Sequence, residues 1–226
     1  MGPRLRVRIA SFPNAVNDDQ VDATTLALNQ LQYPLFPNSK ACVALDIVTQ
    51  PLPDRYYFVG WIPVRQADDC TVLVFDLMDH DVVYFERCPA EPVENQIGRL
   101  RDISRTYNGA VVWAFDGPDE ALLHALELER VYVQRVTLSR SQRAASYENL
   151  RLLMRKLLIG YPDCPELSAE LDVFKSDFTF NGQPDYSLQG AQQSGIDALC
   201  LVTFDLNPEA RRKPFTIYYG YDRDLI

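Results

Sequence analysis

The chain has 226 residues, 47% of them hydrophobic, which allows one sizeable core with additional segments around it. Its 22 Lys and Arg residues are outnumbered by 31 Asp and Glu residues, and the formal net charge of −9 at pH 7 disfavours long-range attraction to a phosphate backbone. No apolar run reaches the roughly 18 to 20 residues of a membrane-spanning helix, and no signal-like block follows Met1, so we expect a soluble intracellular protein.

The first 55 residues are interpreted as a segment with little hydrophobic core of its own. A polar cluster that begins at Asn17 is typical of a helix N-terminus and predicts a helix extending to about Gln32. Prolines then punctuate the sequence, and one apolar run, 42–48, is a strand candidate between them. We expect a helix and a linker here rather than a second domain.

A dense α/β domain is predicted from residue 56 to about residue 206. Three β-rich runs separated by short polar turns are typical of an antiparallel meander, and helices then alternate with strands. The predicted strands are 57–62, 71–77, 82–87, 110–115 and 131–138. The predicted helices are 92–107, 121–128, 147–159, 165–174 and 195–206, with a hairpin at 178–186 that turns at Asn181-Gly182. Residues 207–226 are expected to form a C-terminal tail.

The order of these elements predicts the fold class. Three antiparallel strands followed by helix, strand, helix, strand and helix require a mixed sheet with helices on its faces. The same order is that of the ribonuclease H-like fold, an α/β architecture. It has a mixed five-stranded sheet, with three antiparallel strands and then two parallel ones, flanked by helices.

The cysteines and histidines indicate no linked site. The five cysteines are an odd number, widely spaced and mostly inside apolar runs, which favours buried free thiols over disulfides or CxxC metal spacing. They are Cys42, Cys70, Cys88, Cys164 and Cys200. The two histidines, His80 and His124, occur at unrelated places and do not indicate a zinc site.

Four strings in the predicted domain carry a family resemblance. They are Asp69-Cys70-Thr71-Val72-Leu73-Val74, Val83-Tyr84-Phe85-Glu86-Arg87, Arg105-Thr106-Tyr107-Asn108-Gly109-Ala110-Val111-Val112, and Pro165-Glu166-Leu167 followed by Glu170-Leu171 and Phe174. Together they resemble the nuclease domain of the large terminase subunit of tailed phages. The resemblance implies that DNA is cut with two divalent ions, Mg²⁺ or Mn²⁺, held by acidic side chains. Two such ions, about 4 Å apart, need several converging carboxylates, because they clamp both the attacking water and the leaving 3′ oxygen.

Only part of the acidic set that this family uses is present. Asp116, at the end of the fourth predicted strand, matches the acid of that strand, although aspartate before Gly-Pro is also a good turn residue in any protein. The G-x-D pattern of the first strand falls on Gly60-Trp61-Ile62, so an isoleucine stands at the first acid. The H-D-D-x-V-D-A pattern of the last helix falls on 192–198, which keeps Asp197 but has Ser194 in place of an acid. The resemblance therefore implies a degenerate catalytic site.

A second copy of the closing motif precedes the domain. Residues 11–25 resemble the end of another terminase lineage, with Asn17 where histidine usually stands, and this copy has kept the acids Asp18 and Asp19. Two interpretations are open. In one, the acids begin a solvated helix in a recombined or decayed gene, where the helix dipole favours them. In the other, the helix docks beside the sheet and brings both carboxylates toward Asp116, which partly rebuilds a metal site.

Basic residues gather on one predicted helix. Arg143, Arg151, Arg155 and Lys156 form either an ordinary polar helix face or a surface that contacts DNA phosphates. No G-x-x-x-x-G-K-S/T string occurs, so the packaging ATPase itself is not in this chain.

The resemblance implies a metal-dependent DNA endonuclease of viral genome packaging, weakened or lost in activity, that uses Asp116 with Asp18, Asp19 or Asp197. The alternatives are a non-catalytic terminase-derived domain that binds DNA or a packaging partner, and a decayed reading frame with a folded core. The expected partners are double-stranded DNA and other terminase subunits or the portal, with no membrane. The expected location is the cytoplasm of a phage-infected or prophage-bearing bacterium.

Overall fold

The computed structural model describes residues 35–36, 39–44, 47–63, 70–89, 91–115, 118, 120–174, 177–178, 184–185 and 194–208. Within these ranges no helix combines the length and the apolarity that crossing a membrane would require.

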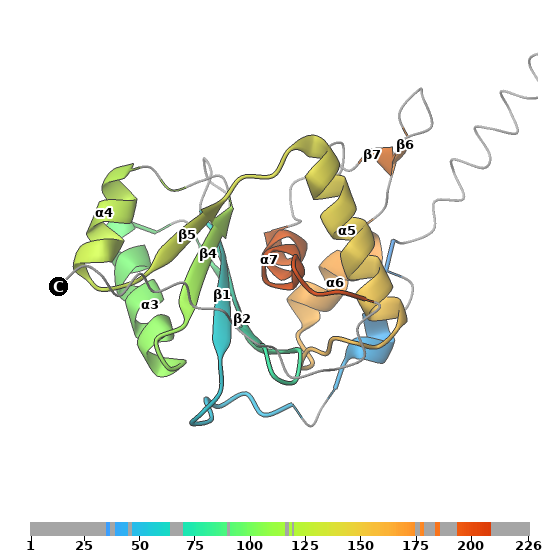
Figure 1. The fold of residues 1–226 in the computed structure, drawn as a ribbon, viewed down its shortest axis with the longest axis horizontal. Coiled ribbons are helices and arrows are strands. Elements are labelled where there is room, and N and C mark those ends of the chain that lie inside the picture. The colour runs from blue at the N-terminus through green and yellow to red at the C-terminus, as the bar shows by residue number, and fades with distance from the viewer. Residues whose placement is uncertain are drawn as a thin grey trace, which may run out of the picture.

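A five-stranded mixed sheet lies at the centre of the domain, in the order β3-β2-β1-β4-β5 (Figure 1). The strands are β1 (Tyr57–Ile62), β2 (Cys70–Asp76), β3 (Asp81–Cys88), β4 (Val111–Phe115) and β5 (Val133–Val136). β1, β2 and β3 pair in antiparallel fashion, whereas β4 pairs in parallel with both β1 and β5. The predicted ribonuclease H-like fold class is confirmed.

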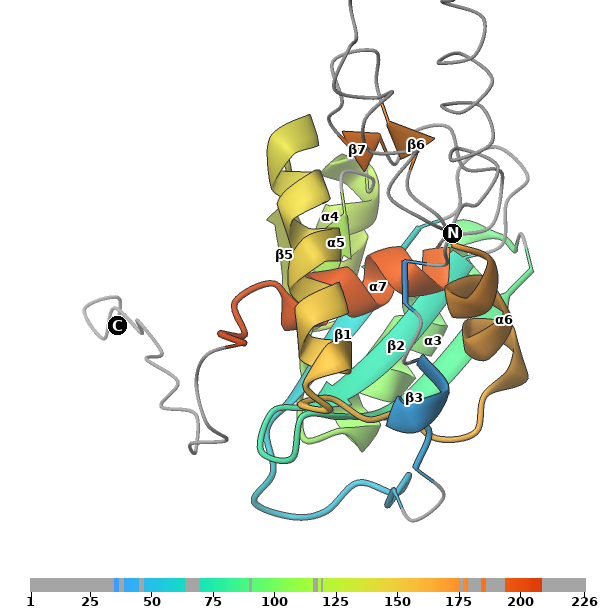
Figure 2. The ribbon, with the colours of Figure 1, turned by 90° about the vertical axis from the view of Figure 1, so that its right-hand side faces the viewer.

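Helices cover both faces of this sheet (Figures 1 and 2). The helices on one face are α3 (Val93–Thr106) and α4 (Glu120–Leu128). Those on the other face are α5 (Arg140–Arg155), α6 (Pro165–Val173) and α7 (Ser194–Thr203). Because successive strand side chains point to opposite faces, the sheet separates two hydrophobic cores. In β1, Val59 and Trp61 belong to the core under α3 and α4, and Phe58 and Ile62 pack against the core under the other three helices.

The last helix, α7, lies directly on the sheet, across β1 and β2 (Figure 2). Gly60 of β1 makes this approach possible, because a Cβ atom at this position would lie 2.6 Å from the Ala198 carbonyl oxygen and 3.0 Å from a Val202 methyl group. A larger residue would therefore push α7 away from the strand. The glycine in the Gly60-Trp61-Ile62 string is thus explained by helix packing.

Helix α5 begins earlier than its hydrophobic spacing predicts. We expected a helix over 147–159, but a capping box at Ser139 starts it at Arg140. The Ser139 hydroxyl accepts from the Gln142 backbone N–H, and the Gln142 side chain accepts from the Ser139 N–H. The helix ends at Arg155, and Leu157 then takes a positive φ of 53°. The extra turns bring Arg143 into the helix that covers the sheet.

Part of the N-terminal segment packs on the same face as α5, α6 and α7. Leu35, Phe36 and Cys42 are buried in that core, and the Leu35 N–H donates to the Phe174 carbonyl at 2.8 Å. The strand expected at 42–48 is wrong for the described residues of this run. The 3₁₀ helix η1 (Ser39–Cys42) occupies its start, and Val43 forms a single bridge with Tyr161.

The predicted hairpin at 178–186 is confirmed at its strands. β6 (Asp177–Phe178) and β7 (Pro184–Asp185) pair in antiparallel fashion. The Asn181-Gly182 turn lies outside the described residues, as does the predicted helix over 17–32. The division of the chain into segments 1–55, 56–206 and 207–226 stays a prediction.

Candidate functional site

One row of side chains crosses the sheet on the face that α7 covers. Thr71 of β2 lies opposite Arg87 of β3 on one side and Ile62 of β1 on the other. Trp61 pairs with Ala114, so the next residues along these parallel strands, Ile62 and Phe115, lie at the same level. Because β1 and β4 both end here, this row marks the carboxyl edge of the parallel pair. In open α/β sheets, sites commonly form at such an edge.

The N-terminus of α7 packs on this row. The Ser194 hydroxyl lies 2.7 Å from the Thr71 hydroxyl, which fixes the start of the helix over β2. One turn later, Asp197 is half-buried and faces α5. Ser194 therefore lies beside the strand position that neighbours Ile62, at the edge where β4 also ends, and Asp197 follows on the same helix. The resemblance assigned these positions to one site. Asp116 follows β4 directly, but it lies outside the described residues, as do Asp18 and Asp19.

Asp197 is held by a buried tyrosine. The Tyr147 hydroxyl of α5 donates a short hydrogen bond to Asp197 Oδ1, and the tyrosine side chain is fully buried. Burial, followed by the negative charge of Asp197, raises the pKa of Tyr147 well above its usual range. The phenol therefore stays protonated and remains a donor to the carboxylate. Sequence reasoning missed Tyr147, which stood only as the first residue of the helix expected over 147–159.

A positive charge also lies at this end of the sheet. The guanidinium carbon of Arg143 is 4.2 Å from the centroid of the Phe115 ring, which is a cation–π contact at the last residue of β4. Burial raises the pKa of the Cys200 thiol, Asp197 raises it further, and Arg143 lowers it. The charges of Arg143 and Asp197 thus act on the same small region. The guanidinium of Arg143 therefore lies against the end of β4.

A buried carboxylate supports the start of α7 from the other side. Glu170 of α6 is only 4% exposed, and its Oε2 accepts the Ile196 N–H at 3.0 Å. It also forms an ion pair with Arg87 of β3. A Cβ at Gly195 would lie 2.7 Å from Glu170 Oε2, so glycine allows the carboxylate to reach the helix end. An anionic group is favoured at a helix N-terminus. Glu170 and Arg87 both occur in the family-like strings, where the sequence assigned them no role.

The basic residues of α5 do not act as one group. Arg151 Nη2 pairs with Glu148 Oε2 on the same helix at 2.7 Å, and Lys156 Nζ donates to the Pro208 carbonyl at 3.0 Å. Arg155 is exposed. Contact of Arg143, Arg151, Arg155 and Lys156 with DNA stays a prediction.

The described donors of the row do not fit a pair of divalent ions. Ile62 offers no oxygen, and the hydroxyls of Thr71 and Ser194 bond to each other. The Asp197 carboxylate already accepts from Tyr147, and the Glu170 carboxylate is paired with Arg87. Two hard cations need several carboxylate oxygens that converge on them. On the described residues, this site is incomplete as a two-ion centre.

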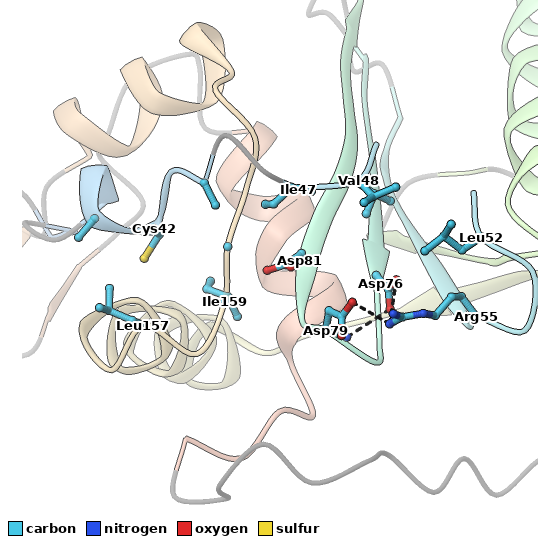
Figure 3. Close-up of a pocket in the computed structure, with 14 residues that line it drawn as sticks. Cys42, Ile47, Val48, Leu52, Arg55, Asp76, Asp79, Asp81, Leu157 and Ile159 are labelled. Carbon is cyan, nitrogen blue, oxygen red and sulfur yellow. Dashed lines mark hydrogen bonds and ion pairs between the residues drawn. The ribbon is translucent and has the colours of Figure 1, made fainter. Parts of the chain in front are cut away.

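A separate cavity of about 390 Å³ lies at the opposite end of the strands and is lined in part by residues of 41–44 and 47–55 (Figure 3). Arg55 Nη1 lies 2.8 Å from Asp79 Oδ2 and 3.6 Å from Asp76 Oδ2. Asp76 Oδ1 also accepts the Met78 N–H at 2.7 Å, which shapes the turn after β2. These acids shape a turn and pair with one arginine, and we do not assign the functional site to this cavity.

No family model and no curated protein matches the sequence, but solved structures do match the fold. The large terminase nuclease of thermophilic phage G20c is 21% identical with a TM-score of 0.67, and the match covers 76% of this chain and 98% of that chain. The same nuclease has been solved with bound magnesium. The Thermus phage P74-26 large terminase nuclease domain is 23% identical with a TM-score of 0.66, covering 75% and 93%.

A more distant match supports the same conclusion. The nuclease domain of the large terminase of bacteriophage SPP1, with bound Mn, is 13% identical with a TM-score of 0.51, covering 71% of this chain and 93% of that chain. The resemblance predicted from sequence strings is confirmed at the level of the fold. This chain folds like the nuclease domains of phage large terminases.

Proposed function

We propose that this chain is a nuclease-like domain of the phage DNA-packaging terminase type, in which metal-dependent cleavage of DNA is weakened or lost. The observation that carries the proposal is the row at the ends of β1 and β4. The fold has the positions for an acidic site there, but Ile62 stands at the first acid, Ser194 bonds to Thr71, and Asp197 is held by Tyr147.

Each of these features weakens the binding of hard cations. An isoleucine removes an oxygen ligand and its negative charge, and affinity for Mg²⁺ or Ca²⁺ depends on the number of such charges. A carboxylate that accepts a short hydrogen bond must give up part of that interaction before it binds an ion. The Arg143 cation near Asp197 adds a like-charge repulsion to any incoming divalent ion.

The residues that would hold an ion are Asp197 and Asp116, with Mg²⁺ or Mn²⁺ as the ion. The G20c and SPP1 nuclease structures with bound magnesium and Mn support this choice of metals. Such an ion supplies charge stabilisation and an activated water for phosphodiester cleavage. Asp18 and Asp19 contribute only if the N-terminal helix docks beside β4.

The proposal is tested by cleavage of supercoiled plasmid DNA over a titration of Mg²⁺ and of Mn²⁺. We expect at most slow nicking that needs high metal concentration and that Asp116→Ala abolishes. Retarded plasmid without nicking under all metal conditions supports the form in which cleavage is lost and DNA binding remains. Efficient cleavage at low millimolar Mg²⁺ that survives Asp116→Ala contradicts the proposal, because the ions would then sit on other carboxylates.

A further inference from the structure

Two cysteines far apart in the sequence face each other in the sheet. Cys70 of β2 and Cys88 of β3 are directly paired across the antiparallel ladder, and each is only 1% exposed. Both belong to the core on the α3 side of the sheet. This is the face opposite to the row that contains Thr71 and Arg87, so the cysteine pair is separate from the acidic site. The sequence correctly indicates buried free thiols, but it does not show that two of them meet.

A carboxylate completes the cluster. The two sulfur atoms and one carboxylate oxygen of Glu91 all lie within 4.8 Å of one another. Glu91 is oriented by Arg99 of α3, whose Nε lies 3.0 Å from Oε1 and whose Nη2 lies 3.2 Å from Oε2. Each carboxylate oxygen has two lone pairs, so both can accept from Arg99 and still offer a lone pair to a metal ion. A carboxylate ligand held by a hydrogen-bonded partner is a common feature of protein metal sites.

We propose that Cys70, Cys88 and Glu91 bind a thiophilic divalent cation, with zinc as the expected metal. Zinc bonds of about 2.3 Å to sulfur and about 2.1 Å to oxygen place tetrahedral ligand atoms about 3.5 to 3.8 Å apart. The three ligand atoms lie within 4.8 Å of one another, so side-chain rotations that shorten the separations by about 1 Å or less bring them to this spacing. Thiolate ligands select zinc over Mg²⁺ and Mn²⁺. A water molecule takes the fourth position.

The surroundings favour a cation. Two thiolates, Glu91 and the nearby Glu86 outweigh the single positive charge of Arg99, which also pairs with Glu86 at 2.5 Å. Thiolate is the form of cysteine that binds metals, so zinc binding would release the two thiol protons. The bound ion would link the start of β2 and the end of β3 to the residues just before α3.

The test uses the full chain, purified under reducing conditions, loaded with Zn²⁺ and passed through a desalting column. We expect one zinc ion per chain by elemental mass spectrometry, and sulfur-to-metal charge-transfer absorption when Co²⁺ replaces zinc. The double variant Cys70→Ser, Cys88→Ser should retain no zinc, whereas Cys164→Ser, a partly exposed thiol elsewhere, should retain all of it. Glu91→Gln should weaken zinc binding by about tenfold or more.

A second readout uses the unmodified chain and does not depend on how the variants fold. The alkylation rate of each cysteine is followed by peptide mass spectrometry with and without Zn²⁺. Zinc should slow alkylation of Cys70 and Cys88 and leave the rate at Cys164 unchanged. The proposal is overturned if the reduced chain retains no zinc, if the double cysteine variant retains as much as the parent, or if the two thiols are found only as a disulfide that forms in place of metal binding.

Discussion

Substitution of Glu170 by alanine tests how α7 is held over the sheet. Glu170 accepts the Ile196 N–H at the start of α7 and pairs with Arg87, and its side chain is only 3% exposed. Alanine removes both interactions at once. The Arg87 guanidinium, 16% exposed, is then left without its carboxylate partner.

The expected loss of stability is large. Removal of one partner from a buried ion pair costs about 3 to 5 kcal/mol, because the remaining charge stays buried and uncompensated. For a chain of this size, 1 kcal/mol corresponds to about 2 to 4 °C in Tm, so a fall of about 6 to 20 °C is expected. Urea unfolding followed by circular dichroism measures the free energy, and a thermal scan measures the Tm.

Two further variants make the result specific. Glu170→Gln keeps an acceptor for the Ile196 N–H but loses the charge that pairs with Arg87, so its loss should be smaller than that of alanine. Glu166→Ala removes an exposed acid from the same helix and should cost less than about 1 kcal/mol. If Glu170→Ala cost no more than Glu166→Ala, Glu170 would hold neither the start of α7 nor Arg87, and this reasoning would be refuted.

Two other predictions concern α5. Tyr147→Phe should lower stability by about 1.5 to 3 kcal/mol, because the half-buried Asp197 carboxylate loses the hydrogen bond from the Tyr147 hydroxyl. Since the folded state raises the pKa of Tyr147, this residue stabilises the fold below the ordinary tyrosine pKa of about 10, and that stability is lost as the pH rises above it. The variant should therefore lose less stability than the parent between neutral and strongly alkaline pH, and an equal loss would contradict the assignment. The double variant Arg151→Ala, Arg155→Ala should weaken DNA binding and reduce the salt slope by about 0.9 for each phosphate that the two arginines neutralise, as measured by fluorescence anisotropy. The matched control is Arg101→Ala with Arg105→Ala on α3, across the sheet, and an equal effect of both pairs would remove α5 from the DNA-contacting surface.

Local patterns in the sequence predict most of the elements of the described fold. The apolar, β-rich run 57–62 matches β1 (Tyr57–Ile62) at both ends, because a short apolar run bounded by turns is a local signal. The start of α5 was placed too late, because the apolar spacing begins at Tyr147 whereas the capping box at Ser139 starts the helix. The N-terminus of α5 is set by side-chain capping, which the spacing of hydrophobic residues does not predict.

Residues of the candidate site could be predicted from the sequence only where a family motif assigned them a position. Ile62, Ser194 and Asp197 were assigned to one site from motif spacing. In the structure, Ser194 contacts Thr71, which is the cross-strand neighbour of Ile62, and Asp197 follows one turn later on α7. Tyr147 could not be found, because its contact with Asp197 spans 50 residues and depends on how α5 packs on α7. The pairing of Cys70 with Cys88 depends in the same way on the register of β2 and β3, which the spacing of cysteines along the chain does not report.

The central claim, that the row at the ends of β1 and β4 lacks the ligands for two hard cations, is tested most directly by Mn²⁺ binding. Free Mn²⁺ is followed by electron paramagnetic resonance during titration of the unmodified chain, Ile62→Asp and Ile62→Asn. Mn²⁺ prefers carboxylates to thiolates, so it reports on this row rather than on the cysteines. The two variants bear a similar cost of burying a polar side chain, and only aspartate restores the first acid.

We predict weak Mn²⁺ binding by the unmodified chain, tighter binding by Ile62→Asp, and no gain in Ile62→Asn. Tight binding of two Mn²⁺ ions by the unmodified chain, with no change in Ile62→Asp, would contradict the account.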